Sequence, residues 1–255
     1  MRMDLQLRDK VALVTGGSRG LGRAISLSLA AEGARVAINY QNSREQAESI
    51  AAEIRSHHRV EAIAVPGNVA SENDVMAIFM AVEQSLGPLD ILVNNAAVCP
   101  TRQVVDTAEN EWTDTLQVNL TGTFLTCREM VRRLKASGRG GRIVNVSSAA
   151  AFLGSTTGHA PYDASKGGMI SFTISLAREV ASLGIAVNAV APGMMSTDMT
   201  SETLSANLDK YLARIPLRRI GTPEEVAGVV VFLASGAASY MTGATVDVSG
   251  GLLMR

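Results

Sequence analysis

The chain has 255 residues, 47% of them hydrophobic, and a formal net charge of -1 at pH 7, which is typical of one or two globular domains. The near-zero charge argues against a nucleic-acid-binding or polybasic membrane surface, and two cysteines are too few for a disulfide framework. No apolar stretch is long enough for a signal peptide or a membrane span, so we expect a cytoplasmic protein without nucleic-acid or membrane partners.

Strand-like and helix-like segments alternate along the whole chain. Short apolar runs bounded by glycine or asparagine predict strands, and longer amphipathic or Ala/Leu-rich segments predict helices. The expected strands are Val11–Val14, Arg35–Asn39, Val60–Val65, Leu89–Val93, Arg142–Val146, Ile185–Val190 and Thr245–Val248. The expected helices are Leu21–Ala31, Ser43–Ser56, Glu72–Leu86, Glu109–Ser137, Pro161–Leu183 and Glu224–Ser235.

This alternation predicts an α/β fold: a single-domain, doubly wound (Rossmann) parallel sheet of about seven strands with helices on both faces. No linker or repeat divides the chain, so residues 1–255 are expected to form one dinucleotide-binding and catalytic domain. The least regular segment is Met194–Pro216, which is longer than most connections in such folds. We interpret residues 194–216 as a lid over the substrate.

A glycine-rich turn joins the first strand to the first helix. Its glycines let the chain turn sharply, let backbone N–H groups approach a pyrophosphate and let the helix pack closely on the sheet. The phosphates would lie at the positive end of that helix. The turn therefore predicts a dinucleotide site formed by Gly16, Ser18, Arg19, Gly20, Leu21 and Gly22.

Tyr162 and Lys166 are four residues apart on a predicted helix, so they lie on the same side of it, one turn apart. A buried ammonium would favour tyrosinate and lower a pKa that is ordinarily about 10. A tyrosine tuned in this way can exchange a proton with a substrate oxygen near neutral pH. Together with the dinucleotide site, this pair predicts an oxidoreductase.

Several further motifs accompany these two, in order, over essentially the whole chain. They are Gly-x3-Gly-x-Gly in the turn, Asn94-Asn95-Ala96-Ala97 after the fourth strand, Asn119 in the long helix, Ser148 after the fifth strand, and Pro192-Gly193 after the sixth. Jointly they resemble the short-chain dehydrogenase/reductase family. That resemblance implies a nicotinamide cofactor and a catalytic set of Asn119, Ser148, Tyr162 and Lys166.

The resemblance also implies a role for each of these residues. Tyr162 would be the acid in reduction and the base in oxidation, and Lys166 would lower the tyrosine pKa and hold the nicotinamide ribose. Ser148, preferred over its neighbour Ser147, would stabilise the substrate oxygen, and Asn119 would hold a water that links Lys166 to solvent. Further cofactor contacts are implied for Asn39, Tyr40, Asn68, Val69, Asn95, Ala96, Tyr162, Lys166, Pro192, Gly193, Met195 and Thr197.

Charge near the end of the second strand bears on which nicotinamide cofactor is used. An acid there would bond a free ribose 2′-OH and repel a 2′-phosphate. Residues 38–44 contain no acid, whereas Arg19 would lie close to such a phosphate and Arg44 is a second basic residue nearby. We therefore predict NADP(H), with NAD(H) as the alternative. No grouping of His, Cys, Asp and Glu has metal-ligand spacing, so no metal is expected.

Three side chains around the motifs are expected to matter less. Cys99 is interpreted as filling space, and Asp163 as facing away from the site. His159 either lines the substrate mouth or lies at the surface, and the sequence leaves both open.

Three segments bear on the substrate. Ser175–Val180, Pro192–Thr200 and the ending Val248–Gly251 look most like bacterial 3-oxoacyl-[acyl-carrier-protein] reductases, which implies a 3-oxoacyl thioester substrate and an acyl carrier protein as partner. Leu183 stands where carrier-binding members often have a basic residue. A sugar, polyol or other small secondary-alcohol dehydrogenase is therefore the alternative, and a non-catalytic dinucleotide-binding protein the remote one.

Two expectations concern partners. Basic side chains around the mouth would meet an acidic carrier protein, and they are expected to be Arg139 together with Arg132, Arg133 and Lys135. The family resemblance also implies a homotetramer, with Glu109–Ser137 and Pro161–Leu183 pairing across one interface and the last helix and strand across another.

Overall fold

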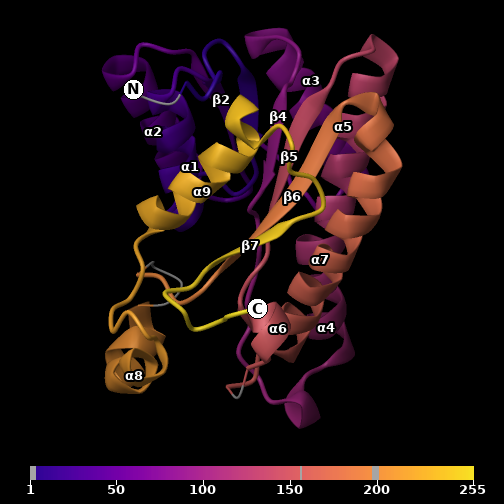
Figure 1. Cartoon of the computed structure of the whole chain (residues 1–255). Coiled ribbons are helices and arrows are strands. Elements are labelled where there is room, and N and C mark those ends of the chain that lie inside the picture. The colour runs from indigo at the N-terminus through magenta and orange to yellow at the C-terminus, as the bar shows by residue number, and fades with distance from the viewer. Residues whose placement is uncertain (1–3, 156, 197–200) are drawn as a thin grey trace.

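The computed structural model describes residues 4–155, 157–196 and 201–255, of which 201–207 are described by their backbone alone. Seven strands form one sheet in the order β3-β2-β1-β4-β5-β6-β7, and every neighbouring pair is parallel (Figure 1). The predicted fold class is confirmed. The strands are β1 Val11–Val14, β2 Arg35–Tyr40, β3 Ala62–Pro66, β4 Ile91–Asn94, β5 Gly141–Val146, β6 Ile185–Pro192 and β7 Thr245–Val248.

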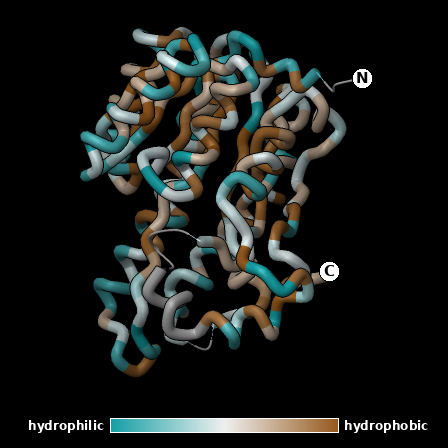
Figure 2. The backbone as a smooth tube through the Cα atoms, turned by 90° about the vertical axis from the view of Figure 1, so that its left-hand side faces the viewer, coloured by the Kyte–Doolittle hydropathy of each residue, from teal (hydrophilic) through white to brown (hydrophobic). Residues whose placement is uncertain are grey.

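Helices cover both faces of this sheet. Neighbouring residues of β1 point to opposite faces, so Ala12 and Val14 pack into one core with α1, α2 and α9, while Val11 and Leu13 pack into the other with α3, α5 and α7. Figure 2 shows hydrophobic segments gathered in the interior of the chain. The helices are α1 Gly20–Ala31, α2 Arg44–His57, α3 Glu72–Leu86, α4 Glu109–Leu116, α5 Gly122–Ser137, α6 Ala150–Leu153, α7 Ala160–Val180, α8 Ser201–Arg214 and α9 Pro223–Ala234.

Two predicted segments differ from the structure in more than their end residues. The expected helix over 109–137 is interrupted by a π-helical turn, Gln117–Thr121, between α4 and α5. The segment predicted to be irregular, 194–216, contains the helix α8. Leu208 and Leu212 are four residues apart, which is a helical spacing, but the Ser/Thr/Met-rich residues before them hid this signal. Figure 1 shows α8 at the same end of the molecule as α6 and the C-terminus.

A buried polar network crosses the core between β4, β5, α5 and α7. Asn94 Nδ2 donates to Asn145 Oδ1 at 2.9 Å, and Asn145 Nδ2 donates to Thr173 Oγ1 at 2.9 Å. Thr126 Oγ1 donates to Asn94 Oδ1 at 2.7 Å. Each of these side chains has partners, so the network does not carry the penalty of unpaired buried polar groups.

Among the described residues, no helix has the length and apolar character needed to cross a membrane.

Candidate active site

The sheet order changes direction between β1 and β4, which is where open α/β sheets form a ligand crevice at the carboxyl ends of their strands. The loops after these two strands are tied together there. Asn95 Nδ2 donates to the carbonyls of Thr15 and Gly16 at 3.0 Å each, and the backbone N–H groups of Asn95 and Ala96 donate to Thr15 Oγ1. Asn95 and Ala96, predicted as cofactor contacts, therefore also shape the glycine turn.

The glycine turn fits the phosphates of a dinucleotide. Arg19 is the N-cap residue of α1 but makes no side-chain cap, and the first turn of α1 carries no acid. Elsewhere in the described chain, α3 and α9 are capped by Ser71 and Thr222 and have acids in their first turns. An uncapped helix start leaves N–H groups and the positive end of the helix dipole available to an anion.

Gly22 shows how closely the turn packs. A Cβ at Gly22 would lie 2.2 Å from the Gly16 carbonyl oxygen and 2.7 Å from Asn95 Nδ2, so no side chain fits. Gly16 and Gly20 have φ angles of 59° and 50°, which favour glycine. Ser18 and Leu21, also predicted as contacts, are buried beside them.

The predicted contacts on β2 and after β3 take different positions. Asn39 is buried, and its amide is used internally: Nδ2 donates to the carbonyls of Val65 and Gly67. Asn39 Oδ1 accepts from Gly16 N at 3.4 Å, so this residue supports the glycine turn from below. Tyr40 is also buried.

Asn68 and Val69 follow β3. Asn68 Oδ1 accepts from Ala70 N, and Val69 packs where a Cβ at Gly122 would lie 3.0 Å from it. A hollow of about 400 Å³ opens beside them, at the end where the adenine half of a dinucleotide would lie. It is lined by Gln41, Pro66, Gly67, Asn68, Asp74 and Ala77.

The loop after β6 is fixed at its base. Gly193 N donates to Val248 O, and a Cβ at Gly193 would lie 2.7 Å from Ser249 Cα. Pro192 O accepts from Ala149 N at 2.8 Å, which joins this loop to the segment that carries Ser148. Thr197, predicted as a cofactor contact, lies outside the described residues.

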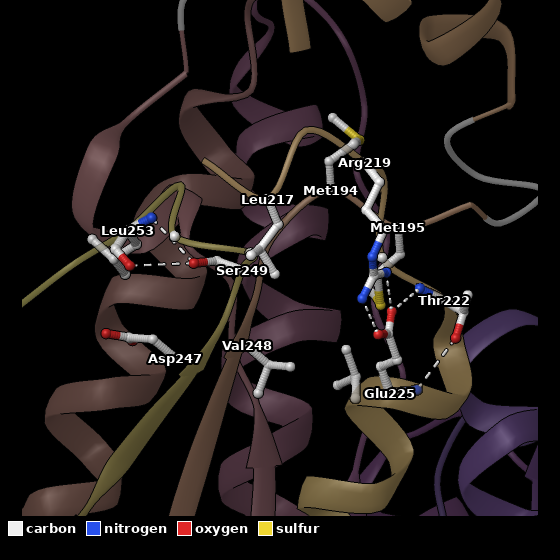
Figure 3. A pocket seen from close by; sticks show the side chains of 14 residues that line it. Met194, Met195, Leu217, Arg219, Thr222, Glu225, Asp247, Val248, Ser249 and Leu253 are labelled. Atoms are coloured by element: carbon white, nitrogen blue, oxygen red, sulfur yellow. Dashed lines mark hydrogen bonds and ion pairs between the residues drawn. The ribbon is translucent and has the colours of Figure 1, made fainter. Parts of the chain in front are cut away.

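Met195 pairs with Gly221 in a short parallel bridge, so the excursion that contains α8 begins and ends at the same place. Beside this bridge lies a hollow of about 300 Å³ (Figure 3). Arg219 and Glu225 lie on one side of it and form a two-bond ion pair (Figure 3). This ion pair and a bond from the Thr222 N–H lower the pKa of the Glu225 carboxyl to about 2. Ser148, Tyr162 and Lys166 do not line this hollow, which is therefore separate from the catalytic cluster.

The two serines after β5 have different partners. Ser147 is buried, and its hydroxyl donates to the Lys166 carbonyl at 2.9 Å. Ser148 is less buried and is hydrogen-bonded to the side chain of Tyr162. Ser148, and not Ser147, is therefore the serine that is hydrogen-bonded to the Tyr162 phenol.

Tyr162 and Lys166 lie together as the four-residue spacing predicts: Lys166 Nζ is 5.6 Å from the centre of the Tyr162 ring. Lys166 is 1% exposed, and its Nζ donates to Val146 O at 2.7 Å. Burial lowers the pKa of Lys166 to about 8. Since an ammonium buried in this way is costly, its retention indicates a role other than stability.

The predicted effect on Tyr162 is wrong for the chain by itself. Burial raises the pKa of Tyr162 above its ordinary value, the nearby Cys99 raises it further, and the hydrogen bond with Ser148 opposes them. The physical reason is that the ammonium of Lys166 bonds Val146 O and lies over the ring, so it does not compensate for the desolvation of tyrosinate. The phenol is therefore held in its neutral, proton-donating form.

Asn119 is fully buried within the π-helical turn. Its Oδ1 accepts from Val98 N and its Nδ2 donates to Val98 O, each at 2.9 Å, and Nδ2 also donates to Ser165 Oγ at 3.0 Å. Such turns are often found at functional sites. The side chain of Asn119 is thus occupied by protein contacts, and the π-helical turn is the feature that sets this position apart.

Three residues that the sequence analysis set aside lie at the site. Cys99 is within electrostatic range of Tyr162 and Lys166, and burial raises the pKa of its thiol to about 11. His159 contacts Cys99, with 3.5 Å between Nδ1 and Sγ. Asp163 was expected to face away, but its carboxylate raises the pKa values of both Cys99 and Tyr162. The sequence offered one indication that His159 and Asp163 lie at the site, which is that both are close to Tyr162 along the chain.

Arg139 does not lie at the mouth of the site as predicted. It precedes β5, whereas Ser148 follows it, so the full length of the strand separates the two residues. Arg139 Nη2 instead bonds Asp90 at 2.5 Å, at the amino edge of the sheet. Arg133 is paired with Glu83 and Glu129. In the described residues, no group of three or more His, Cys, Asp or Glu side chains is arranged to hold a metal ion.

Comparison with known proteins agrees with this geometry. A family model described as enoyl-(acyl carrier protein) reductase matches residues 16–253. A 3-oxoacyl-[acyl-carrier-protein] reductase of Aquifex aeolicus is 43% identical over 98% of this chain and 100% of its own length. One from Synechocystis is also 43% identical, over 97% of this chain and 98% of its own.

The chain belongs to the short-chain dehydrogenase/reductase family. Solved structures of members agree closely with it. A putative gluconate dehydrogenase from Agrobacterium tumefaciens has a TM-score of 0.94 at 35% identity and covers 100% of both chains. A putative short-chain alcohol dehydrogenase from Sinorhizobium meliloti has a TM-score of 0.92 at 36% identity and covers 98% of both chains. The predicted class, an oxidoreductase of this family, is confirmed.

Proposed function

We propose that this short-chain dehydrogenase/reductase is an NADP(H)-dependent reductase of 3-oxoacyl thioesters. The observation that carries the proposal is the meeting of Ser148 with Tyr162, beside buried Lys166, at the carboxyl edge of the sheet. The substrate class is supported by two relatives, each 43% identical over almost the whole chain, that are named 3-oxoacyl-[acyl-carrier-protein] reductases.

The catalytic steps follow from the protonation states of these side chains. The nicotinamide supplies the hydride when it is bound. Ser148 donates a hydrogen bond to the substrate carbonyl oxygen and stabilises negative charge that develops there. Tyr162, which is neutral at neutral pH because its pKa is raised from an ordinary value of about 10, gives its hydroxyl proton to the same oxygen. Lys166, whose Nζ lies 5.6 Å from the centre of the Tyr162 ring, is the group from which the proton is replaced. The Asn119 side chain, bonded to Val98 and Ser165, holds this part of the site in place.

A small secondary-alcohol dehydrogenase is the second candidate. Two observations favour it: similar solved structures are named alcohol and gluconate dehydrogenases, and Arg139 lies on the far edge of the sheet from Tyr162. Acyl carrier protein as a partner therefore belongs to the first candidate only.

A substrate screen separates the two candidates. Purified protein is mixed with NADPH and, in separate assays, an acetoacetyl thioester, a keto sugar and a simple ketone, and oxidation is followed at the nicotinamide absorbance. The thioester is expected to have the highest kcat/KM. A higher value for the keto sugar would favour the second candidate, and no turnover with any carbonyl despite NADPH binding would contradict both.

Preference for NADP(H) is proposed from the charges around the 2′-position. Arg19 is exposed in the glycine turn, and the residues that follow β2 include no acid before Glu45. Arg44 is also exposed, but its Nε bonds Glu48 at 2.7 Å, so its charge is already paired. Arg19 is therefore the better partner for a 2′-phosphate.

Changing Arg19 to alanine is expected to weaken NADPH binding roughly 10-fold, the order of a lost charge-assisted hydrogen bond at an exposed site, and to leave NADH binding unchanged. Fluorescence titration of both cofactors measures this. Arg44→Ala is the matched control and should change NADPH binding much less. Equal affinities of the unmodified protein for the two cofactors would contradict the assignment.

Two further features belong to this proposal. We assign the segment 194–216, including α8, as the substrate lid, because it starts directly after the Pro192–Gly193 loop, which Ala149 joins to the segment of Ser148. Residues 197–200 of this segment lie outside the described residues. We also propose a cytoplasmic homotetramer. Phe124 and Ile174, on α5 and α7, are 42% and 41% exposed, which supports helix pairing between subunits on that face.

A further inference from the structure

Residues 98–102, which we call the strap, connect the π-helical turn to the start of α7. At one end, Asn119 holds both backbone groups of Val98 at 2.9 Å. At the other end, Arg102 N donates to the Gly158 carbonyl at 2.7 Å. The strap therefore spans the distance between two elements that both carry proposed catalytic residues.

His159 ties the middle of the strap to α7. Its Nδ1 lies 3.2 Å from the Pro100 carbonyl oxygen, and 3.5 Å from both Cys99 Sγ and Thr101 Oγ1. A carbonyl oxygen can only accept, so Nδ1 carries the proton in this contact. His159 is the N-cap residue of α7, three positions before Tyr162. Its imidazole thus connects the strap to the turn that carries the phenol.

The chain reversal at Gly158 is shaped for this contact. Gly158 has a φ angle of 86°, and a Cβ there would lie 2.7 Å from the carbonyl carbon and oxygen of Arg102. Only glycine allows both the left-handed conformation and this close approach. The junction of the strap with α7 is therefore held by two separate features, the Gly158 backbone and the His159 side chain.

The contacts close into a ring. Ser165 Oγ donates to the Tyr162 carbonyl at 2.6 Å and accepts from Asn119 Nδ2 at 3.0 Å. Tyr162 is thus bounded by Asn119 on the Ser165 side and by His159 on the strap side. A change in the position of the strap moves one side of this ring while β5, which carries Ser148, stays in the sheet.

We propose that His159 is a positioning residue, whose Nδ1–H bond to Pro100 fixes the Tyr162 phenol relative to Ser148 for proton transfer. This inference rests on the proposed reductase function. It adds to the catalytic set a side chain that acts through the strap and does not itself exchange the proton. In this proposal Cys99 and Pro100 are the strap residues that His159 contacts.

Kinetics of two substitutions test the proposal. His159→Ala removes the donor and is expected to lower kcat roughly 10-fold, with the dissociation constant for NADPH unchanged, because a small displacement of a reacting group is costly. His159→Asn places an amide N–H close to where Nδ1–H was and is expected to restore most of kcat. His57→Ala, an exposed histidine on α2, is the control and should change neither value.

A second measurement does not depend on turnover. Cys99 is only partly exposed and its Sγ contacts His159, so the native protein should react slowly with the thiol reagent DTNB. His159→Ala should speed labelling of this thiol several-fold, and His159→Asn should not. The same labelling in a Cys99→Ser background assigns the thiol, because Cys127 is fully buried in the core.

The outcomes separate cleanly. Unchanged kcat in His159→Ala, or an asparagine variant as slow as the alanine variant, overturns the positioning role. Unchanged labelling shows that His159 does not hold the strap and overturns it as well. If the unmodified protein reduces no carbonyl compound, the proposed function fails, while the labelling experiment still decides whether His159 holds the strap.

Discussion

Replacing Tyr162 by phenylalanine is expected to lower kcat by about 10³-fold, within the range that general acid catalysis contributes, while NADPH binds as before. The ring stays in place, and only the hydroxyl that meets Ser148 is lost. Since this phenol carries its proton at neutral pH, the substitution removes the proton donor for reduction. Steady-state kinetics and a fluorescence titration of NADPH measure the two quantities.

Tyr240→Phe removes the same hydroxyl from a side chain that is fully exposed, and it should leave kcat unchanged. Near-normal turnover in Tyr162→Phe would mean that another group donates the proton. Cys99, which lies in the same cluster, would then be the first alternative to test.

Lys166→Met is expected to abolish turnover and, at the same time, to raise the free energy of unfolding at neutral pH. Burial lowers the pKa of Lys166 from its ordinary value to about 8, so holding the ammonium in the folded chain costs on the order of 3 kcal/mol. The bond that Nζ donates to Val146 O is lost in the variant, which offsets about 1 kcal/mol. A net gain of about 2 kcal/mol is expected.

The pH dependence of this gain follows from where each state binds the proton. Between about pH 8 and the ordinary lysine pKa, the unfolded chain keeps the proton and the folded chain has released it, so the stability of the unmodified protein rises with pH. The advantage of the methionine variant is therefore full below pH 8. It passes through zero before pH 10.5, where the unmodified protein is the more stable by about 1 kcal/mol, the value of the Val146 bond. Urea unfolding at a series of pH values measures it, and a constant difference across that range would contradict the burial argument.

The sheet could be predicted from sequence because its strands are short apolar runs with clear boundaries. β1 and β7 begin and end at the predicted residues, and α3 does as well. β2 and β6 run further, to Tyr40 and Pro192, because backbone pairing with a neighbouring strand continues after the apolar run ends. Strand pairing is a tertiary property, so the sequence pattern does not mark its last residue.

The π-helical turn was not predictable in the same way. Residues 109–137 have a continuous helical pattern, and one additional residue in a turn changes no composition. Its consequence is nevertheless large, because the turn contains Asn119, whose buried amide holds Val98.

The residues of the candidate site could be proposed from motifs, but their electrostatics could not. The four-residue spacing gave the proximity of Tyr162 and Lys166 correctly. The direction of the Tyr162 pKa shift depends on burial and on where the ammonium points, neither of which spacing contains. Asp163 was misjudged for the same reason: Cys99, whose pKa its carboxylate raises, comes from a loop that is distant in sequence.

The buried amides of Asn94 and Asn145, with Thr126 and Thr173, affect the register in which β5 pairs with β4. A slip of β5 by a single residue against β4 would turn Asn145 to the other face and leave its partners without bonds, at about 1–3 kcal/mol for each orphaned group. A purely aliphatic interior would tolerate that slip more readily. These four polar side chains thus favour one register of β5 against β4. The same register places Ser148, at the end of β5, correctly relative to Lys166 on α7.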